Sequence, residues 1–129
     1  MKKSIIIVTL SLLLAGCGKE TDYVTDLTLS DKSISIETDF FDDMEAIVNV
    51  KGNASTEVTA VSSDESLVSV EAWADDEEPG LNYIDLETYG NTGEAEITVT
   101  TVGTDKHDRT IEKKFKVTVV EELEEEDEE

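Results

Sequence analysis

Apolar and polar residues alternate with a period of two over most of this chain. The stretch 94–101 shows the pattern clearly, because Ala95, Ile97 and Val99 are separated by glutamate and threonine residues. Successive side chains of a β-strand point to opposite faces of its sheet, so this spacing is typical of a strand with one buried face. We therefore expect strands, and no helix, from residue 23 onward.

Turn-forming residues divide the alternating pattern into about eight short strands. Glycine, asparagine, aspartate and serine favour turns, and they recur between the apolar runs. The segment 74–80 contains a proline and four acids, which excludes it from a central strand. Two points stay open, namely which face of 67–72 is buried and whether 81–88 contains a bulge. The expected strands are 24–29, 33–38, 44–50, 57–62, 67–72, 81–88, 94–101 and 110–120, with an acidic turn at 39–43.

Short strands at regular spacing indicate an all-β sandwich or barrel. Three motifs support a narrower interpretation: VTAVSSDESLVSV at 58–70, GEAEITVT at 93–100 and KVTV at 116–119. Together they resemble the bacterial Ig-like domain, group 2, and the resemblance covers residues 23–120. It implies an Ig-like antiparallel β-sandwich of about 7–8 strands.

Two features depart from the pattern of that family. Ala60 stands where the family has a tryptophan, and the acidic segment 74–80 is an insertion. Trp73 is then expected either to fill the core from another position or to lie exposed. The family occurs in surface and secreted bacterial proteins. The resemblance therefore implies an adhesive or structural role and supplies no catalytic residues.

The first 17 residues have the order of an export signal. Two lysines precede an apolar run at 5–15, which is about half of the roughly 20 residues that a permanent membrane-spanning helix needs. The motif Leu14-Ala15-Gly16-Cys17 then resembles the lipobox of bacterial lipoproteins. The resemblance implies cleavage between Gly16 and Cys17 and attachment of a diacylglyceryl lipid to the Cys17 thiol. An ordinary cleaved signal and a buried free thiol are the alternatives.

A lipid on Cys17 would anchor the chain in the cell membrane or the outer membrane, facing outside the cytoplasm. Two or more acyl chains hold a protein on a membrane, whereas one chain binds only marginally. Because Cys17 is the single cysteine, the domain has no disulfide. The chain then divides into a signal peptide at 1–16, an acylated tether at 17–22, an Ig-like domain at 23–120 and a disordered acidic tail at 121–129.

The charge of the chain excludes one class of partner. Its 32 acidic residues exceed its 10 basic residues and give a formal net charge of −22. Binding to nucleic acid phosphates requires clustered lysine and arginine, so we expect no nucleic acid partner. We also expect no small-molecule substrate and no cofactor beyond the covalent lipid.

Two acidic segments are candidate calcium sites, because Ca²⁺ takes six to eight oxygen ligands. Neither has the spacing or the turn glycine of an EF-hand, so a solvated acidic loop is the favoured interpretation and no metal site is predicted. The weak candidates are Asp39, Asp42 and Asp43 in one segment, and Asp75, Asp76, Glu77 and Glu78 in the other.

Catalysis has little support. His107 is the only histidine, and it lies in the charged stretch 105–109 with no nucleophile marked nearby. A serine triad needs a base held between a nucleophile and a carboxylate, and one histidine cannot build a typical zinc site. The expectation is that the protein is not an enzyme.

Aromatic residues are the weak candidates for partner binding, since aromatic side chains dominate the energy of protein interfaces. The candidates are Phe40, Phe41 and Trp73, and Tyr89 belongs to the same test. Clustering of these residues on one surface would favour binding. Burial of all of them would favour a spacer.

Charge is also arranged along the C-terminal part. Five of the positive charges lie between Lys106 and Lys116, and pairing of the last two strands would place Glu96 opposite Lys114 or Lys116. Opposite charges across strands contribute about 0.2–1 kcal/mol per pair, which predicts internal pairing instead of a ligand patch. Residues 121–129 contain eight acids, a composition typical of a solvated, disordered tail, with capture of a basic partner as the alternative.

These observations predict a lipid-anchored, extracytoplasmic, non-enzymatic Ig-like domain that binds a surface protein or a glycan at the cell envelope. The alternatives are a structural spacer or accessory subunit of a surface assembly, and a calcium-stabilised surface domain.

Overall fold

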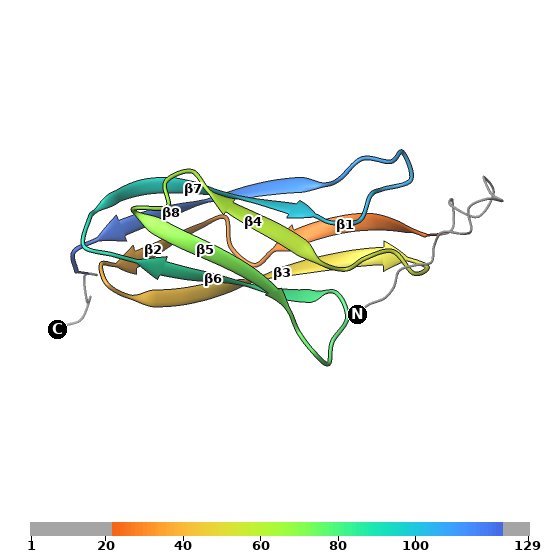
Figure 1. The fold of residues 1–129 in the computed structure, drawn as a ribbon, viewed down its shortest axis with the longest axis horizontal. Helices are drawn as coiled ribbons and strands as arrows, with labels where there is room; N and C mark the ends of the chain where they lie inside the picture. Colours follow the sequence, from red (N-terminus) through yellow and green to blue (C-terminus); the bar gives the residue numbers. More distant parts are fainter. Residues whose placement is uncertain (1–21, 123–129) are drawn as a thin grey trace.

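The computed structural model describes residues 22–122, and these form strands connected by turns (Figure 1). Most strand positions agree with the alternation in the sequence. The strands are β1 (Tyr23–Leu29), β2 (Ser33–Glu37), β3 (Phe41–Lys51), β4 (Val58–Ser62), β5 (Val68–Ala74), β6 (Leu81–Thr88), β7 (Gly93–Thr101) and β8 (Glu112–Val120).

The strands form two four-stranded sheets that enclose one core. One sheet has the order β1-β3-β6-β5 and the other has the order β2-β8-β7-β4. Figure 1 shows the sheets as two layers of an elongated domain. The prediction of an all-β sandwich is therefore confirmed.

One strand pairing differs from the expected antiparallel arrangement. β2 runs parallel to β8, with Ser33 opposite Lys116 and Glu37 opposite Val120. The chain leaves the first sheet after Leu29 and enters the second at Ser33 without reversing its direction. Because β1 and β2 run the same way along the two sheets, β2 meets β8 in parallel register.

The core is formed by the inward side chains of both sheets and is almost entirely aliphatic. Phe115 is the one buried aromatic side chain in the described part of the chain, whereas Trp73 is 46% exposed. Trp73 therefore does not replace the tryptophan that the family pattern has at Ala60, which itself packs against the core partly buried. The buried apolar residues are Val24, Leu27, Ile36, Met44, Ala46, Val48, Val58, Leu67, Val68, Ile84, Leu86, Ala95, Ile97, Val99, Phe115, Val117 and Val119.

The expected acidic turn at 39–43 is shorter than predicted. β3 begins at Phe41, and the turn is confined to residues around Asp39, which has a φ of 55°. Phe41 and Asp43 continue the alternation of β3 on its exposed side, so the acidic residue at 43 reflects an outward face and not a break in the strand.

The two open points about β5 and β6 are resolved by side-chain burial and strand register. Val68 is fully buried and Val70 packs against the core, so the even positions of β5 face inward. β6 has a continuous register with both neighbours and no bulge. Asn82 takes an inward position there, and its Nδ2 amide donates a hydrogen bond to the Thr56 carbonyl oxygen at 2.8 Å. This bond makes burial of the amide acceptable.

Gly80 permits the close approach that starts β6. Its φ is 93°, and a Cβ atom there would lie 2.6 Å from the Val48 carbonyl oxygen. The Val48 amide in turn donates to the Gly80 carbonyl oxygen at 2.8 Å. No other residue fits this turn without strain.

Candidate functional site

The outward side chains of β3, β6 and β5 form a surface that we call the acidic–aromatic face. Strand pairing aligns these side chains in three rows across the three strands. The rows are Phe41, Glu87 and Ser69; Asp43, Asp85 and Glu71; and Glu45, Tyr83 and Trp73.

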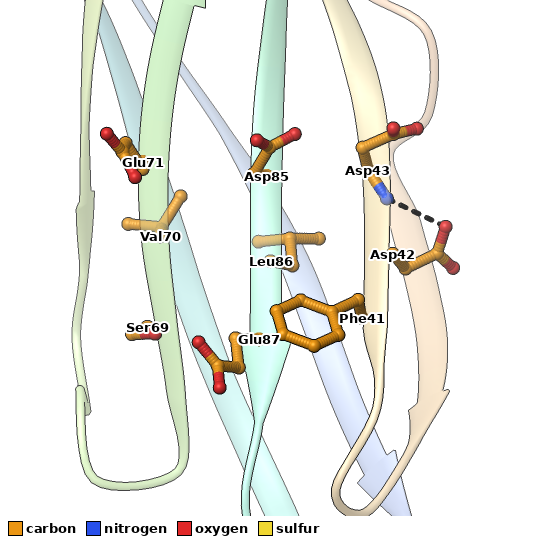
Figure 2. Close-up of a pocket in the computed structure, with 9 residues that line it drawn as sticks. All are labelled: Phe41, Asp42, Asp43, Ser69, Val70, Glu71, Asp85, Leu86 and Glu87. Atoms are coloured by element: carbon orange, nitrogen blue, oxygen red, sulfur yellow. Dashed lines mark hydrogen bonds between the residues drawn. The ribbon is translucent and has the colours of Figure 1, made fainter.

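The middle row consists only of carboxylates. Asp85 is the register partner of both Asp43 and Glu71, and Figure 2 shows the three side by side. Directly opposed side chains on one sheet face have Cβ atoms about 4.5–5.5 Å apart, and like charges at that distance are destabilising. Among residues 22–122 the structure records no salt bridge on this face. The row therefore carries concentrated negative charge.

Two aromatic rings lie beside the carboxylate row. The ring centroids of Trp73 and Tyr83 are 4.6 Å apart with an interplanar angle of 30°. The indole Nε1 of Trp73 donates a hydrogen bond to Oδ2 of Asp85 at 2.7 Å. This bond orients the indole while nearly half of its surface remains exposed.

A shallow hollow of about 540 Å³ lies over the carboxylate row and the adjacent row on the side away from Trp73 and Tyr83. Phe41, Ser69 and Glu87 line it together with the three carboxylates, and Figure 2 shows the Phe41 ring extending from β3 toward β6. Phe41 is 70% exposed. The Tyr89 hydroxyl lies 2.8 Å from Oγ of Ser69, which brings Tyr89 to the same end of the face.

The negative potential of this face is also reflected in the ionisation of a tyrosine. Partial desolvation is the first cause that raises the pKa of Tyr83 above 10.0, and the charges of Asp75, Glu45, Glu78 and Asp43 raise it further. A second negative charge is disfavoured where several carboxylates already lie.

The outer side of the other sheet neutralises its charges internally. The Nζ atom of Lys114 lies 3.8 Å from Glu96, and Nζ of Lys116 lies 3.8 Å from Glu94. The prediction that the last two strands pair these charges is confirmed. The contacts run diagonally, because Glu96 is the register partner of Lys116 and not of Lys114. We call these four residues of β7 and β8 the ion-paired face.

The structure places the calcium candidates in ordinary turns and strands. Within residues 22–122 it brings together no three His, Cys, Asp or Glu side chains that could hold a metal ion. Oδ2 of Asp75 instead accepts hydrogen bonds from the backbone amides of Glu77 and Glu78, while Asp76 is exposed. Asp42 and Asp43 lie in β3 and Asp39 lies in the turn before it.

His107 belongs to a turn held by a neighbouring carboxylate. Oδ1 of Asp105 accepts hydrogen bonds from the backbone amides of His107, at 2.8 Å, and Arg109, at 3.0 Å. These two hydrogen bonds hold the pKa of Asp105 below its ordinary value of 3.8, and the bond from the Arg109 amide has the larger effect. The cluster of charges at 105–109 therefore shapes the loop between β7 and β8.

Several sequence predictions fall outside the described residues. These include the signal peptide, the cleavage position at Gly16, the lipid attachment at Cys17 and most of the acidic tail. In the part that is described, no helix is long and apolar enough to cross a membrane.

The aromatic candidates are exposed, but they do not form one patch. Phe41 and Trp73 share the acidic–aromatic face on opposite sides of the carboxylate row, and Phe40 and Tyr89 lie on the side of Phe41. Sequence reasoning did not single out Glu71, Asp85 or Glu87. The sequence does show that residues 83, 85 and 87 alternate with apolar residues and so share one face of β6. It does not show which residues lie opposite them on β3 and β5, because that depends on the strand register.

No protein-family model matches this chain, and no curated protein matches it. Solved structures do match its fold. Domains 4 and 5 of the S-layer protein SbsC align with a TM-score of 0.59 and 15% sequence identity, over 77% of this chain and 53% of that chain. A longer SbsC structure, rSbsC(31-844), aligns with a TM-score of 0.61 and 12% identity, over 78% of this chain and 13% of that one. This chain thus spans about half of the shorter structure and a small part of the longer one.

These similarities, with the strand order of the two sheets, define an Ig-like β-sandwich. The predicted fold class is confirmed. At such low sequence identity the likeness carries the fold alone, so the role of the domain has to be argued from its surface.

Proposed function

We propose that this chain is a lipid-anchored, extracytoplasmic Ig-like domain that binds a partner at the cell envelope without catalysis. The observation that carries the binding role is the acidic–aromatic face. Its exposed aromatic rings lie beside carboxylates that repel one another across the strands, and exposed apolar surface rimmed by polar groups is typical of interaction sites.

The anchor rests on the sequence. Cys17 follows a short apolar run and two small residues, which is the order found in lipoprotein signals. The similarity of the domain to parts of SbsC, a surface layer protein, fits a location outside the cytoplasm.

The orientation of the domain supports a binding role over a purely passive one. β1 begins at one end of the long axis, and β8 ends at the other (Figure 1). The row of Phe41, Glu87 and Ser69 lies at the end where β6 finishes and β8 finishes. An anchor before β1 would hold this end of the acidic–aromatic face away from the membrane and accessible to a partner.

The anchor is tested by mass spectrometry of the protein isolated from a bacterial host that processes lipoproteins. We expect an N-terminus at Cys17 with a diacylglyceryl mass, and we expect Cys17→Ser to move the protein out of the membrane fraction. A chain that still begins at Met1 with an unmodified thiol would refute the anchor.

Binding is tested by capturing cross-linked partners from intact envelopes with the lipidated protein. The double variant Phe41→Ser with Trp73→Ser should lose the captured partner, while Val61→Ser, at an exposed position of β4, should keep it. Equal capture by both variants would favour the alternative role, a spacer in a surface assembly. The elongated shape with its ends far apart favours that alternative (Figure 1).

A further inference from the structure

We propose that the acidic–aromatic face docks an extended, basic segment of a partner protein, with lysine or arginine side chains over the row of Asp43, Asp85 and Glu71. This inference rests on the proposed binding function and specifies the chemistry of the partner. The area is an unpartnered sheet face, and its occupant is argued from charge, ring geometry and strand spacing.

The first argument is charge complementarity. The two sheets of this domain both carry outward acids, but only the ion-paired face supplies cations of its own, Lys114 and Lys116. On β3, β5 and β6 the only basic residue is Lys51, at the far end of β3 from Phe41. Three carboxylates opposed across neighbouring strands repel one another, and a cationic partner would turn that repulsion into attraction.

The second argument is the position of the aromatic rings. Trp73 and Tyr83 lie one row away from the carboxylates on one side, and Phe41 lies one row away on the other. A cation within about 6 Å of an aromatic ring centre is attracted to the ring face, most strongly for tryptophan. A lysine or arginine that pairs with Asp85 or Glu71 would therefore also lie near a ring.

The third argument is spacing. Successive rows on one strand face are two residues apart, which is about 6.6–6.8 Å. Alternate side chains of an extended peptide repeat at the same distance. A basic residue at every second position would therefore meet the hollow near Phe41, the carboxylate row and the Trp73–Tyr83 pair in turn.

Other occupants fit less well. A neutral glycan could stack on Trp73 and Tyr83, but it would leave the carboxylate repulsion in place. A second copy of this chain carries the same net charge of −22. Within residues 22–122 no three carboxylates are placed to share a metal ion, which leaves a basic protein segment as the occupant with the right charge and reach.

The experiment uses intrinsic fluorescence of the full chain, because Trp73 is its only tryptophan and reports this face directly. The probe is an eight-residue capped peptide that alternates threonine and arginine, titrated at low salt. We expect a saturable change in Trp73 emission whose midpoint weakens as salt increases, since exposed charge pairs are screened. The same peptide with glutamate in place of arginine should give no change.

A matched pair of variants separates this face from the rest of the acidic chain, including its C-terminal tail. Glu71→Gln with Glu87→Gln removes one charge from the carboxylate row and one from the row beside it. Glu57→Gln with Glu94→Gln removes two exposed charges elsewhere. We expect the first variant to bind the arginine peptide about tenfold more weakly, as the loss of two exposed charge pairs implies, and the second to bind within about twofold of the parent. Thermal melting confirms that both variants fold.

Three results would overturn the inference. They are no emission change up to millimolar peptide, an equal loss of affinity in both variants, and saturable binding of a neutral oligosaccharide in place of the peptide. If envelope capture still succeeds in any of these cases, the binding function stands and only the basic partner is refuted. If capture fails as well, both proposals fail.

Discussion

The two outer faces of this sandwich both carry acidic residues, but only one of them pairs those residues with lysines. On the ion-paired face each glutamate of β7 has a lysine of β8 within 3.8 Å, as Glu96 has Lys114. On the acidic–aromatic face the neighbours across the strands are Asp43, Asp85 and Glu71, all of the same sign. The backbone pairing is regular in both sheets, so the contrast arises only from which side chains the register brings together.

The two faces differ in whether their own side chains compensate their charges. On the ion-paired face, lysines of β8 neutralise the glutamates of β7 within one hairpin. The acidic–aromatic face instead combines repelling carboxylates with exposed rings at Phe41 and Trp73. Repulsion among these carboxylates lowers the stability of the isolated domain, and a cationic partner of the kind we propose would offset it.

The largest expected effect tests whether the contrast is confined to the outside. Ile84 in β6 and Ile97 in β7 are both fully buried, one under each face. We expect Ile84→Ala and Ile97→Ala each to lower the free energy of unfolding by about 2–5 kcal/mol, because each deletes core methyl groups and leaves a cavity. Chemical denaturation measures this. If only one of the two variants lost stability, the two sheets would not contribute equally to the core.

A pair of charge reversals sharpens the contrast between the faces. Glu71→Lys replaces a repulsion with Asp85 by an attraction, so we expect an increase of about 0.5–2 kcal/mol in unfolding free energy. Lys116→Glu does the reverse against Glu94 and Glu96, and we expect a decrease of similar size. Thermal melting of both variants at low salt gives the two signs.

Glu57→Lys is the control for the change in overall charge, because Glu57 is exposed and lies outside the strands. If Glu57→Lys stabilises the domain as much as Glu71→Lys, the effect comes from total charge and not from the carboxylate row. High salt should reduce both reversals, since it screens exposed charges.

The next effect concerns alkaline pH on the acidic–aromatic face. The folded-state pKa of Tyr83 is raised above 10.0, so the unfolded chain loses this proton first as pH rises. Stability is therefore fully present below about pH 10 and falls as pH rises through the folded pKa. Absorbance of the phenolate at 295 nm, compared between the parent and Tyr83→Phe, isolates this residue. Glu45→Gln removes one of the charges that raise the pKa of Tyr83, so the Tyr83 phenolate should form at a lower pH in that variant.

The smallest effect lies in the loop of the other sheet. The pKa of Asp105 is held below 3.8 by the amides of Arg109 and His107, so its carboxylate stabilises the fold above that value. This stability is lost as pH falls through the folded pKa. We expect Asp105→Ala to melt slightly lower than the parent at pH 7, with the difference vanishing near pH 2. A constant difference at every pH would assign the effect to the turn and not to the charge.

The fold followed from the sequence to a large extent, because a period of two is a local property. Ala95, Ile97 and Val99 face the core as the alternation predicts. The prediction of a turn at Phe41 was wrong, because the acids Asp42 and Asp43 have the composition of a loop. Their place in a strand is set by the pairing of β3 with β6, which the sequence does not show. The inward amide of Asn82 obscured the parity of β6, since its burial depends on a carbonyl oxygen from Thr56.

The candidate site depended on longer-range information. Asp43 and Asp85 are distant in the sequence, and only the pairing of β3 with β6 makes them neighbours. The parallel pairing of β2 with β8 could not be read from local pattern for the same reason. Exposure of Trp73 was one of two expectations, and the aliphatic packing around Phe115 decides between them.

The parallel contact between β2 and β8 also has a mechanical meaning. The first strand starts at one end of the domain and the last strand finishes at the other (Figure 1). Tension applied between those ends would pull β2 and β8 in opposite directions along their length. Their backbone hydrogen bonds would then resist shear together instead of opening one after another.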